Sequence, residues 1–203
     1  MIAAWVVAAA LAGAAFGPPP PGTYRLPPIQ PAPDGRVIDE RGNARSLATL
    51  MQGRIALLGL IYTHCTDADG CPRATWAFSE VRALLRGDPA LERRVRLVSL
   101  SFDPAHDDPR AIAEYASRVR GRSRGADWHF LTTRSQAELS PILDALDQDV
   151  SRVPGSPEAF EHTVKVFLVD PRGRVREIYS SAYLAPEMIV NDIRTLALEG
   201  VSR

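Results

Sequence analysis

The stretch "RIALLGLIYTHCTDADGCPRATWAFSEVRALL" (residues 54–85) holds a strand pattern, both cysteines of the chain and a helix pattern in immediate succession. Its first nine residues form a nearly uninterrupted apolar run, typical of a strand buried on both faces of a sheet. Its last fourteen residues repeat apolar side chains at helical spacing, and Pro72 suits the first turn of a helix. The sequence therefore predicts a buried strand, a short loop with Cys65 and Cys71, and a helix beginning beside Cys71.

Further elements follow from hydrophobic spacing and turn residues on both sides of this stretch. Before it, residues 35–47 predict a short hairpin that turns at Arg41-Gly42-Asn43. Asp108 and Pro109 suit the N-cap and first position of a helix, and Ser140-Pro141 is expected to interrupt a later one. The remaining predicted elements are strands at 94–101 and 128–131, helices at 108–119 and 135–146, a hairpin at 163–181, and a closing helix at 186–198.

The predicted order is β-α-β-α-β-α, followed by a β-hairpin and a closing helix. Parallel strands need crossover helices between them, whereas a hairpin joins antiparallel strands. This order describes an α/β thioredoxin-like fold, with a central mixed sheet flanked by helices and an N-terminal hairpin extension. The cysteine loop then lies at the carboxyl end of the first core strand, the edge that ligand and redox sites favour in open α/β sheets.

The composition is that of an ordinary globular domain with a terminal extension. The chain has 203 residues, of which 45% are hydrophobic and 24% charged, and its net charge is zero. This balance indicates neither nucleic acid nor an anionic membrane surface as the main partner. The sequence contains no Walker loop, dinucleotide-binding glycine pattern or serine-nucleophile elbow.

The N-terminal residues differ from the rest. Residues 1–17, "MIAAWVVAAALAGAAFG", are apolar and free of charge, and "PPPPG" follows them. This run is near the lower length limit of a membrane-spanning helix, roughly 17–25 residues, and Ala10-Leu11-Ala12 resembles a signal-peptidase site. We predict a signal peptide or membrane anchor at 1–17, a proline-rich extended linker at 18–34 and one domain at 35–203. The expected location is the bacterial periplasm, with the chain membrane-anchored or released by cleavage. In that oxidising compartment two cysteines close in sequence can form a disulfide.

Cys65 and Cys71 carry the chemistry that the sequence predicts. A helix N-terminus has unpaired N–H groups and partial positive charge, which lower the pKa of a cysteine and favour the thiolate. Thiolates attack disulfides and bind soft metals such as Cu(I), zinc and iron–sulfur clusters. Two sulfurs alone make a poor site for most metals, so a third ligand is expected.

The four histidines are the candidates for that ligand. His64 precedes Cys65 at a strand end and is expected to point to the opposite face. His106 is interpreted as a solvated loop residue and His129 as a satisfied strand residue. His162 lies just before the strand that opens the hairpin. In a thioredoxin-like fold, the segment entering that strand packs beside the cysteine loop. His162 is therefore the best-placed third ligand.

The segments "YTHCTDADGCP", "VSLSFDPAHDDPRAIAEYA", "WHFLTT" and "HTVKVFLVDPRGRV" resemble the Sco/SenC/PrrC family, copper chaperones that help assemble cytochrome c oxidase. The resemblance runs from about Leu26 to the C-terminus. It implies a thioredoxin-like fold, an N-terminal membrane anchor, and a copper site made by Cys65, Cys71 and His162. The family's Asp-Pro segment, implied to shape a loop near the site, matches Asp103, Pro104, Asp108 and Pro109.

The cysteine loop is where the sequence departs from the family. Five residues, "TDADG", separate the cysteines, where the family normally has three, and Glu161 replaces the usual Asp before the histidine. Asp69-Gly70 favours an outward bulge that leaves both sulfurs in place. The alternative is that the longer loop repositions Cys71 and alters the ligand angles. Extra metal ligands from Asp67 and Asp69 are less expected than turn formation.

Three functions therefore remain open. The first is a copper-binding assembly factor that delivers Cu(I) or Cu(II) to a cytochrome c oxidase subunit, or maintains its thiols; the partner would be the copper-bearing subunit or another periplasmic copper protein. The second is a thiol–disulfide oxidoreductase in which Cys65 attacks and Cys71 resolves. The third is a domain without copper, in which a structural disulfide fastens the loop. Enzymatic activity is expected only in the second case.

Overall fold

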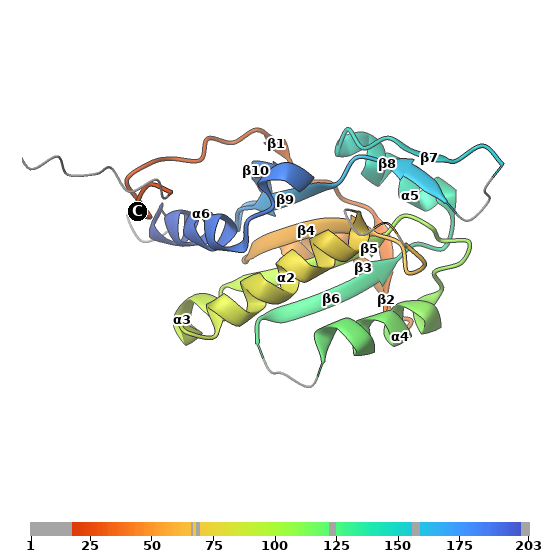
Figure 1. Ribbon diagram of the computed structural model, residues 1–203, viewed down its shortest axis with the longest axis horizontal. Coiled ribbons are helices and arrows are strands. Elements are labelled where there is room, and N and C mark those ends of the chain that lie inside the picture. The colour runs from red at the N-terminus through yellow and green to blue at the C-terminus, as the bar shows by residue number, and fades with distance from the viewer. Residues whose placement is uncertain (1–17, 66, 68–69, 122–124, 156–158, 200–203) are drawn as a thin grey trace, which may run out of the picture.

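The computed structural model describes residues 18–65, 67, 70–121, 125–155 and 159–199 (Figure 1). The predicted signal or anchor segment, residues 1–17, lies outside these ranges. The described strands are β1 (Gln30–Pro31), β2 (Arg36–Asp39), β3 (Ala44–Ser46), β4 (Ile55–Ile61), β5 (Val95–Ser101), β6 (Asp127–Thr132), β7 (Val150–Arg152), β8 (Phe160–His162), β9 (Lys165–Val169) and β10 (Arg174–Ser180). The described helices are α1 (Leu47–Met51), α2 (Cys71–Leu85), α3 (Pro89–Glu92), α4 (Pro109–Arg120), α5 (Gln136–Ala145), the 3-10 helix η1 (Ser181–Tyr183) and α6 (Pro186–Glu199).

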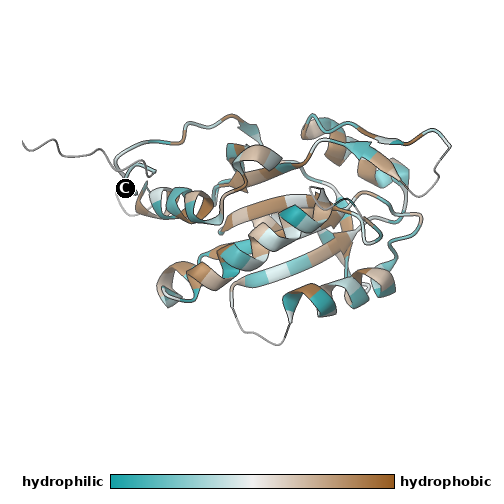
Figure 2. Cartoon of the chain, viewed as in Figure 1, coloured by the Kyte–Doolittle hydropathy of each residue, from teal (hydrophilic) through white to brown (hydrophobic). Residues whose placement is uncertain are grey.

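Strand β4 is the centre of an eight-stranded mixed sheet with the order β1-β10-β9-β4-β5-β6-β2-β3. It pairs in parallel with β5, where Leu57 faces Leu97, and antiparallel with β9, where Leu58 faces Phe167. All seven β4 residues are buried, as the continuous apolar run predicted. Figure 2 shows the same concentration of hydrophobic residues in the central strands. The predicted mixed sheet and thioredoxin-like fold are confirmed.

The helices that connect the parallel strands position the cysteine loop. The β4–α2–β5 and β5–α4–β6 connections join neighbouring parallel strands, and such crossovers are right-handed. Helices α2 and α4 therefore lie on the same face of the sheet, and α6 packs beside α2 (Figure 1). This arrangement places the first residue of α2 at the edge where β4 ends.

Pro141 does not interrupt its helix, so that prediction is wrong. Helix α5 continues from Gln136 to Ala145 with Pro141 inside it. Leu139 and Ile142, on either side of the proline, are fully buried. Packing of both halves against the core therefore compensates for the N–H group that proline lacks.

The proline-rich segment before the domain packs against it. The Gly22 amide donates to Thr195 Oγ1 at 3.1 Å, and the Tyr24 hydroxyl donates to Asp192, both on α6. Leu26 is buried, and β1 extends the sheet by pairing with β10. Tyr24 and Leu26 thus contact the domain from within the segment that was predicted to be an extended linker. Within the described ranges, no helix combines the length and hydrophobicity needed to span a bilayer.

Candidate functional site

The predicted site residues come together from three elements. Cys65 follows the end of β4, Cys71 is the first residue of α2, and His162 is the last residue of β8. Cys71 Sγ lies 3.9 Å from His162 Nε2. Cys71 is almost fully buried and Cys65 is partly buried against the core, and both are free thiols. The fold thus gathers the three residues at the carboxyl edge of the sheet.

The two thiols have opposite pKa shifts. A hydrogen bond with Cys71 lowers the pKa of Cys65 to about 4; His162 and backbone groups add to this effect, against the opposing effect of burial. The pKa of Cys71 is raised, first by its hydrogen bond to Cys65 and then by burial. The helix N-terminus, which favours a thiolate, therefore does not lower the pKa of Cys71, the first residue of α2. Because Cys71 is buried beside a thiolate, a second negative charge there is costly.

Alkylation of the reduced chain should reveal this asymmetry. A thiolate at Cys65 should react at an almost constant rate above about pH 6, and the rate should fall as the pH drops through about 4. Its folded pKa lies below the ordinary value of about 8.5. The ionised Cys65 side chain therefore stabilises the folded chain fully above about pH 8.5. This stabilisation is lost as the pH falls from there through the folded pKa of about 4. Mass spectrometry after pulsed alkylation measures both thiols; a Cys65 rate still rising through pH 8 would contradict the shift.

The spacing of the donors fits a shared metal ion. With bond lengths like those of zinc sites, about 2.3 Å to sulfur and 2.0 Å to nitrogen, ligand atoms on one ion lie roughly 3.5–3.7 Å apart. The separation of 3.9 Å between Cys71 Sγ and His162 Nε2 needs only a small closure. Within the described residues, no three His, Cys, Asp or Glu side chains are already gathered as a metal-binding group. Cys65 nevertheless already forms hydrogen bonds with Cys71 and His162, so metal binding needs only small movements of the three side chains.

Two aromatic rings contact the imidazole, and a third packs against both of them. The ring centroid of His162 lies 4.8 Å from that of Phe102 and 6.4 Å from that of Tyr62. Phe160 packs edge-on against both of these rings. Burial, followed by the neighbouring Cys65, raises the pKa of Tyr62. These rings orient the imidazole. They also form a hydrophobic environment that controls the access of solvent to the candidate metal ligands.

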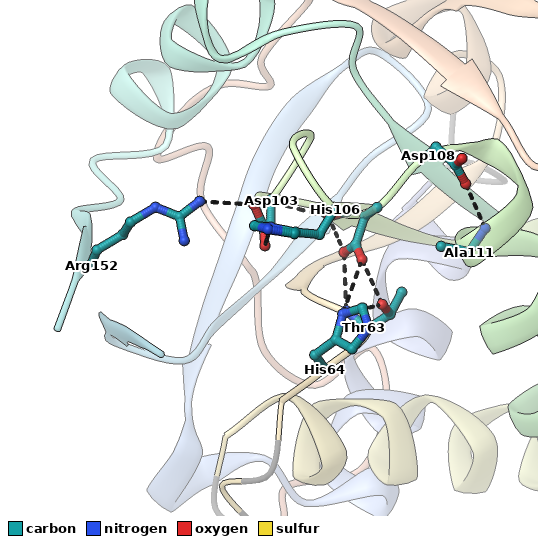
Figure 3. A network of polar contacts seen from close by, with 9 residues as sticks. Thr63, His64, Asp103, His106, Asp108, Ala111 and Arg152 are labelled. Atoms are coloured by element: carbon teal, nitrogen blue, oxygen red, sulfur yellow. Dashed lines mark hydrogen bonds and ion pairs between the residues drawn. The ribbon is translucent and has the colours of Figure 1, made fainter. Parts of the chain in front are cut away.

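A buried carboxylate, Asp107, fixes the start of the cysteine loop. It accepts hydrogen bonds from the Thr63 amide at 3.0 Å, the Thr63 hydroxyl at 2.5 Å and the Ser101 hydroxyl at 2.5 Å. The sequence reasoning selected Asp103 and Asp108 in this segment and missed Asp107. Asp108 is the predicted helix N-cap and accepts from the Ala111 amide at 2.8 Å (Figure 3). The sequence did carry a signal for Asp107: it is a second aspartate, directly before the N-cap residue Asp108, in "DPAHDDP".

A second acidic residue connects this loop to the strand pair that carries His162. Asp103 accepts from Arg152 Nη2 at 3.2 Å (Figure 3). Arg152 also lies over the Phe160 ring, 4.6 Å from its centroid. Arg152 belongs to β7, which pairs antiparallel with β8 so that Val150 faces His162. The Asp103–Arg152 contact therefore holds the β7–β8 pair against the loop after β5. The sequence reasoning predicted neither strand.

Replacing Arg152 with glutamine should weaken metal binding about 10- to 100-fold, the usual effect of residues that support ligands. The variant loses both the ion pair with Asp103 and the contact with Phe160, so His162 is less firmly placed. Competition titration of the reduced chain with a chromogenic copper chelator measures the change. Arg110→Gln is the matched control, because the one contact of Arg110 within the described residues is an exposed pair with Glu114 on α4. Equal affinities of the two variants would contradict a positioning role.

Among the described residues, no recorded hydrogen bond joins the other histidines to either sulfur atom. His64 is mostly exposed and contacts the Thr63 hydroxyl at 3.0 Å. His106 is half exposed, as predicted, but its Nδ1 also pairs with Asp103 at 2.8 Å. The satisfied strand histidine predicted at 129 is contradicted: among the described residues, His129 Nε2 has no hydrogen-bond partner, and burial lowers its pKa.

Of the two aspartates considered as extra metal ligands, Asp67 is exposed. Asp69, the other acidic residue considered, lies outside the described residues.

A dithiol and an imidazole at the carboxyl edge of a thioredoxin-like sheet define a class of proteins that bind soft metal ions or exchange disulfides. Within that class, residues 33–198 match the family model described as SCO1/SenC. The chain belongs to this family, which confirms the resemblance predicted from the sequence.

Individual relatives agree with this assignment. The chain is 25% identical over 158 residues to the "SCO1 protein homolog" of Bacillus subtilis, covering 77% of this chain and 78% of that protein. It spans 58–60% of the length of the mammalian mitochondrial relatives that it matches. The structure of Arabidopsis thaliana ScoI with copper bound has a TM-score of 0.70 and 15% identity, covering 83% of this chain and 98% of that one. The structure of BsSco, described as a member of the Sco family of cytochrome c oxidase assembly proteins with a disulfide switch, has a TM-score of 0.68 and 23% identity, covering 85% and 97%.

Proposed function

We propose that this protein binds copper as its cargo through Cys65, Cys71 and His162 and delivers it to a cytochrome c oxidase subunit. The observation that carries the proposal is the convergence of these three side chains, with Cys71 Sγ 3.9 Å from His162 Nε2. Two thiolates and one imidazole are suitable ligands for copper. Membership of the SCO1/SenC family, and the copper described in the Arabidopsis relative, support the same function.

The two thiols take different parts in binding and release. Cys65 is already a thiolate at neutral pH and is the more exposed sulfur, so it makes the first bond to the arriving ion. Cys71 keeps its proton until the ion binds, so loading releases that proton to solvent. During delivery, a ligand of the acceptor replaces Cys65 first, and the buried Cys71 leaves last.

The location and partner form part of the same proposal. Residues 1–17 would direct the chain to the periplasm and either remain as an anchor or be cleaved. The acceptor would be the copper-bearing oxidase subunit or another periplasmic copper protein. The similarity to BsSco, which is described as belonging to a family of oxidase assembly proteins, supports the first acceptor.

Deletion of the gene tests delivery. The deletion strain should assemble oxidase with less copper, and the normal chain should restore the metal content. A chain with Cys65→Ser and Cys71→Ser should fail to restore it, whereas Arg110→Gln, on the exposed side of α4, should succeed. Metal analysis of purified oxidase gives the result, with immunoblots to confirm equal amounts of each chain. Full oxidase copper in the double-serine strain would contradict the proposal.

The lowered pKa of Cys65, next to the thiol of Cys71, supports thiol–disulfide exchange as a second candidate function. The Cys65 thiolate would attack a partner disulfide, forming a mixed disulfide and releasing one partner thiolate. Cys71 would then lose its proton and attack Cys65, leaving an oxidised Cys65–Cys71 pair and a fully reduced partner. His162→Ala separates the two functions, because it removes a copper ligand but neither sulfur. The variant should bind copper more weakly and should still exchange disulfides. Retained copper binding with lost exchange in that variant would contradict this division.

A further inference from the structure

A basic groove lies at the end of the sheet opposite the cysteines. It has a volume of about 960 Å³ and runs between the N-terminal segment, the β9–β10 turn and the end of α6. A second hollow of about 370 Å³ continues it toward Gly53 and Ile55, where β4 begins. The arginines that line the two hollows are Arg25, Arg94, Arg172, Arg174 and Arg176.

Internal contacts balance only part of this positive charge. The two carboxylates of the groove, Asp170 and Glu199, both pair with Arg176, at 2.9 and 2.7 Å. Arg25, Arg172 and Arg174 are exposed. Within the part of the chain that the structure describes, hydrogen bonds and ion pairs engage none of these three guanidinium groups. Three positive side chains therefore remain available to an external anion.

The groove lies where the apolar N-terminal segment joins the domain. Asn191 Nδ2 donates to the Pro19 carbonyl at 2.9 Å, and the Gly22 amide donates to Thr195, so the chain is held along α6 from its first described residues. Figure 1 shows this segment beside the end of α6, whereas α2 begins at the other end of the strands. A membrane that held residues 1–17 would therefore lie next to the groove.

We propose that the groove binds the phosphate groups of anionic phospholipids in the membrane that carries residues 1–17. Guanidinium groups suit this role because they present paired N–H donors to phosphate oxygens. A basic patch beside a membrane anchor is attracted to the negative surface of anionic lipids, by about 1 kcal/mol per Lys or Arg near the surface. The proposal rests on the membrane attachment proposed above and is independent of copper binding.

Docking through the groove would set the orientation of the copper site. The seven residues of β4 separate the groove from the cysteine loop, a distance of about 20 Å at roughly 3.3 Å per residue. The domain would then hold Cys65 and Cys71 away from the bilayer and toward the aqueous phase. In that orientation they face a partner domain that projects from the same membrane.

Arginine footprinting of the full chain in lipid nanodiscs tests the proposal. Modification of Arg172 and Arg174 by phenylglyoxal, followed by mass spectrometry, should be about fivefold slower in phosphatidylglycerol discs than in phosphatidylcholine discs, as expected from the attraction of each arginine to an anionic surface. Added salt should remove the difference. Arg36 and Arg134, exposed residues outside the groove, serve as internal controls and should react equally in both lipids.

Variants identify the residues responsible. In Arg172→Gln/Arg174→Gln, Arg25 should lose its lipid-dependent protection, whereas in the matched control Arg36→Gln/Arg134→Gln it should keep it. Equal modification in the two lipids would overturn the proposal. Equal protection by inorganic phosphate in phosphatidylcholine discs would also overturn it, because the groove would then be a soluble-anion site. If residues 1–17 do not insert, the membrane attachment fails, and the same comparison with free vesicles still decides whether the groove binds lipid.

Discussion

Replacement of Cys65 with serine is expected to weaken copper binding by the reduced chain by more than about 100-fold. Mutation of a residue that only supports a ligand already lowers metal affinity about 10- to 100-fold. Here the thiolate that makes the first bond to copper is replaced by serine, which is a poor ligand for soft metals. Competition with a chelator of known affinity under anaerobic conditions measures the loss.

Asp67→Asn is the matched control for this variant. Asp67 lies in the same loop and is exposed, and its carbonyl accepts from the Gly70 amide at 3.0 Å, a turn contact that asparagine preserves. Its affinity should therefore stay within about threefold of the normal chain, well below the effect of a supporting residue. A large loss in Asp67→Asn would indicate that this carboxylate is a ligand. An unchanged affinity in Cys65→Ser would exclude the proposed site.

Replacement of Phe102 with alanine should reduce the free energy of unfolding by about 3–5 kcal/mol, the usual cost of removing a buried phenylalanine. Phe102 is 1% exposed and contacts Tyr62, Phe160 and His162 through its ring. Urea unfolding of the reduced chain measures the loss. The same variant should also raise the pKa of Cys65, because His162 loses the ring that orients it.

Phe130→Ala separates these two effects. Phe130 is fully buried, but its ring contacts are with Tyr115 and Trp128 on the α4 side of the sheet. It should lose similar stability, about 3–5 kcal/mol, and leave the titration of Cys65 unchanged. If both variants shifted the Cys65 pKa equally, the aromatic cluster would have no specific role at the site.

Local patterns predicted the central part of the fold correctly. The apolar run that became β4 and the Asp108–Pro109 start of α4 are determined by neighbouring residues alone. The packing of residues 18–34 was not predictable in this way. It depends on contacts such as Tyr24 with Asp192, which lie 168 residues apart in the sequence. The effect of Pro141 likewise depends on burial of its helix rather than on the proline itself.

The same distinction applies to the site. His162 was found because the order of elements places it beside the cysteines, and the structure brings it next to Cys71. Arg152 was missed because its role arises from a contact with Asp103, 49 residues earlier, and from a strand pair too short to leave a hydrophobic pattern. The opposite pKa shifts of the two thiols also depend on burial, which their spacing does not reveal.

Net charge was an incomplete guide to the charge distribution for a similar reason. The net charge of zero did not indicate an anionic membrane surface as the main partner. Folding nevertheless gathers Arg25 with Arg172 and Arg174, which are far apart in the sequence, into one groove. Net charge sums over the whole chain, whereas an anion responds to the local potential.

X-ray absorption spectroscopy of the chain loaded with one equivalent of Cu(I) tests the copper site most directly. We expect two sulfur neighbours and one nitrogen neighbour around copper in the normal chain. In His162→Ala we expect loss of the nitrogen neighbour, with both sulfurs retained. A spectrum dominated by oxygen neighbours, or one unchanged in His162→Ala, would contradict the claim that Cys65, Cys71 and His162 bind the metal.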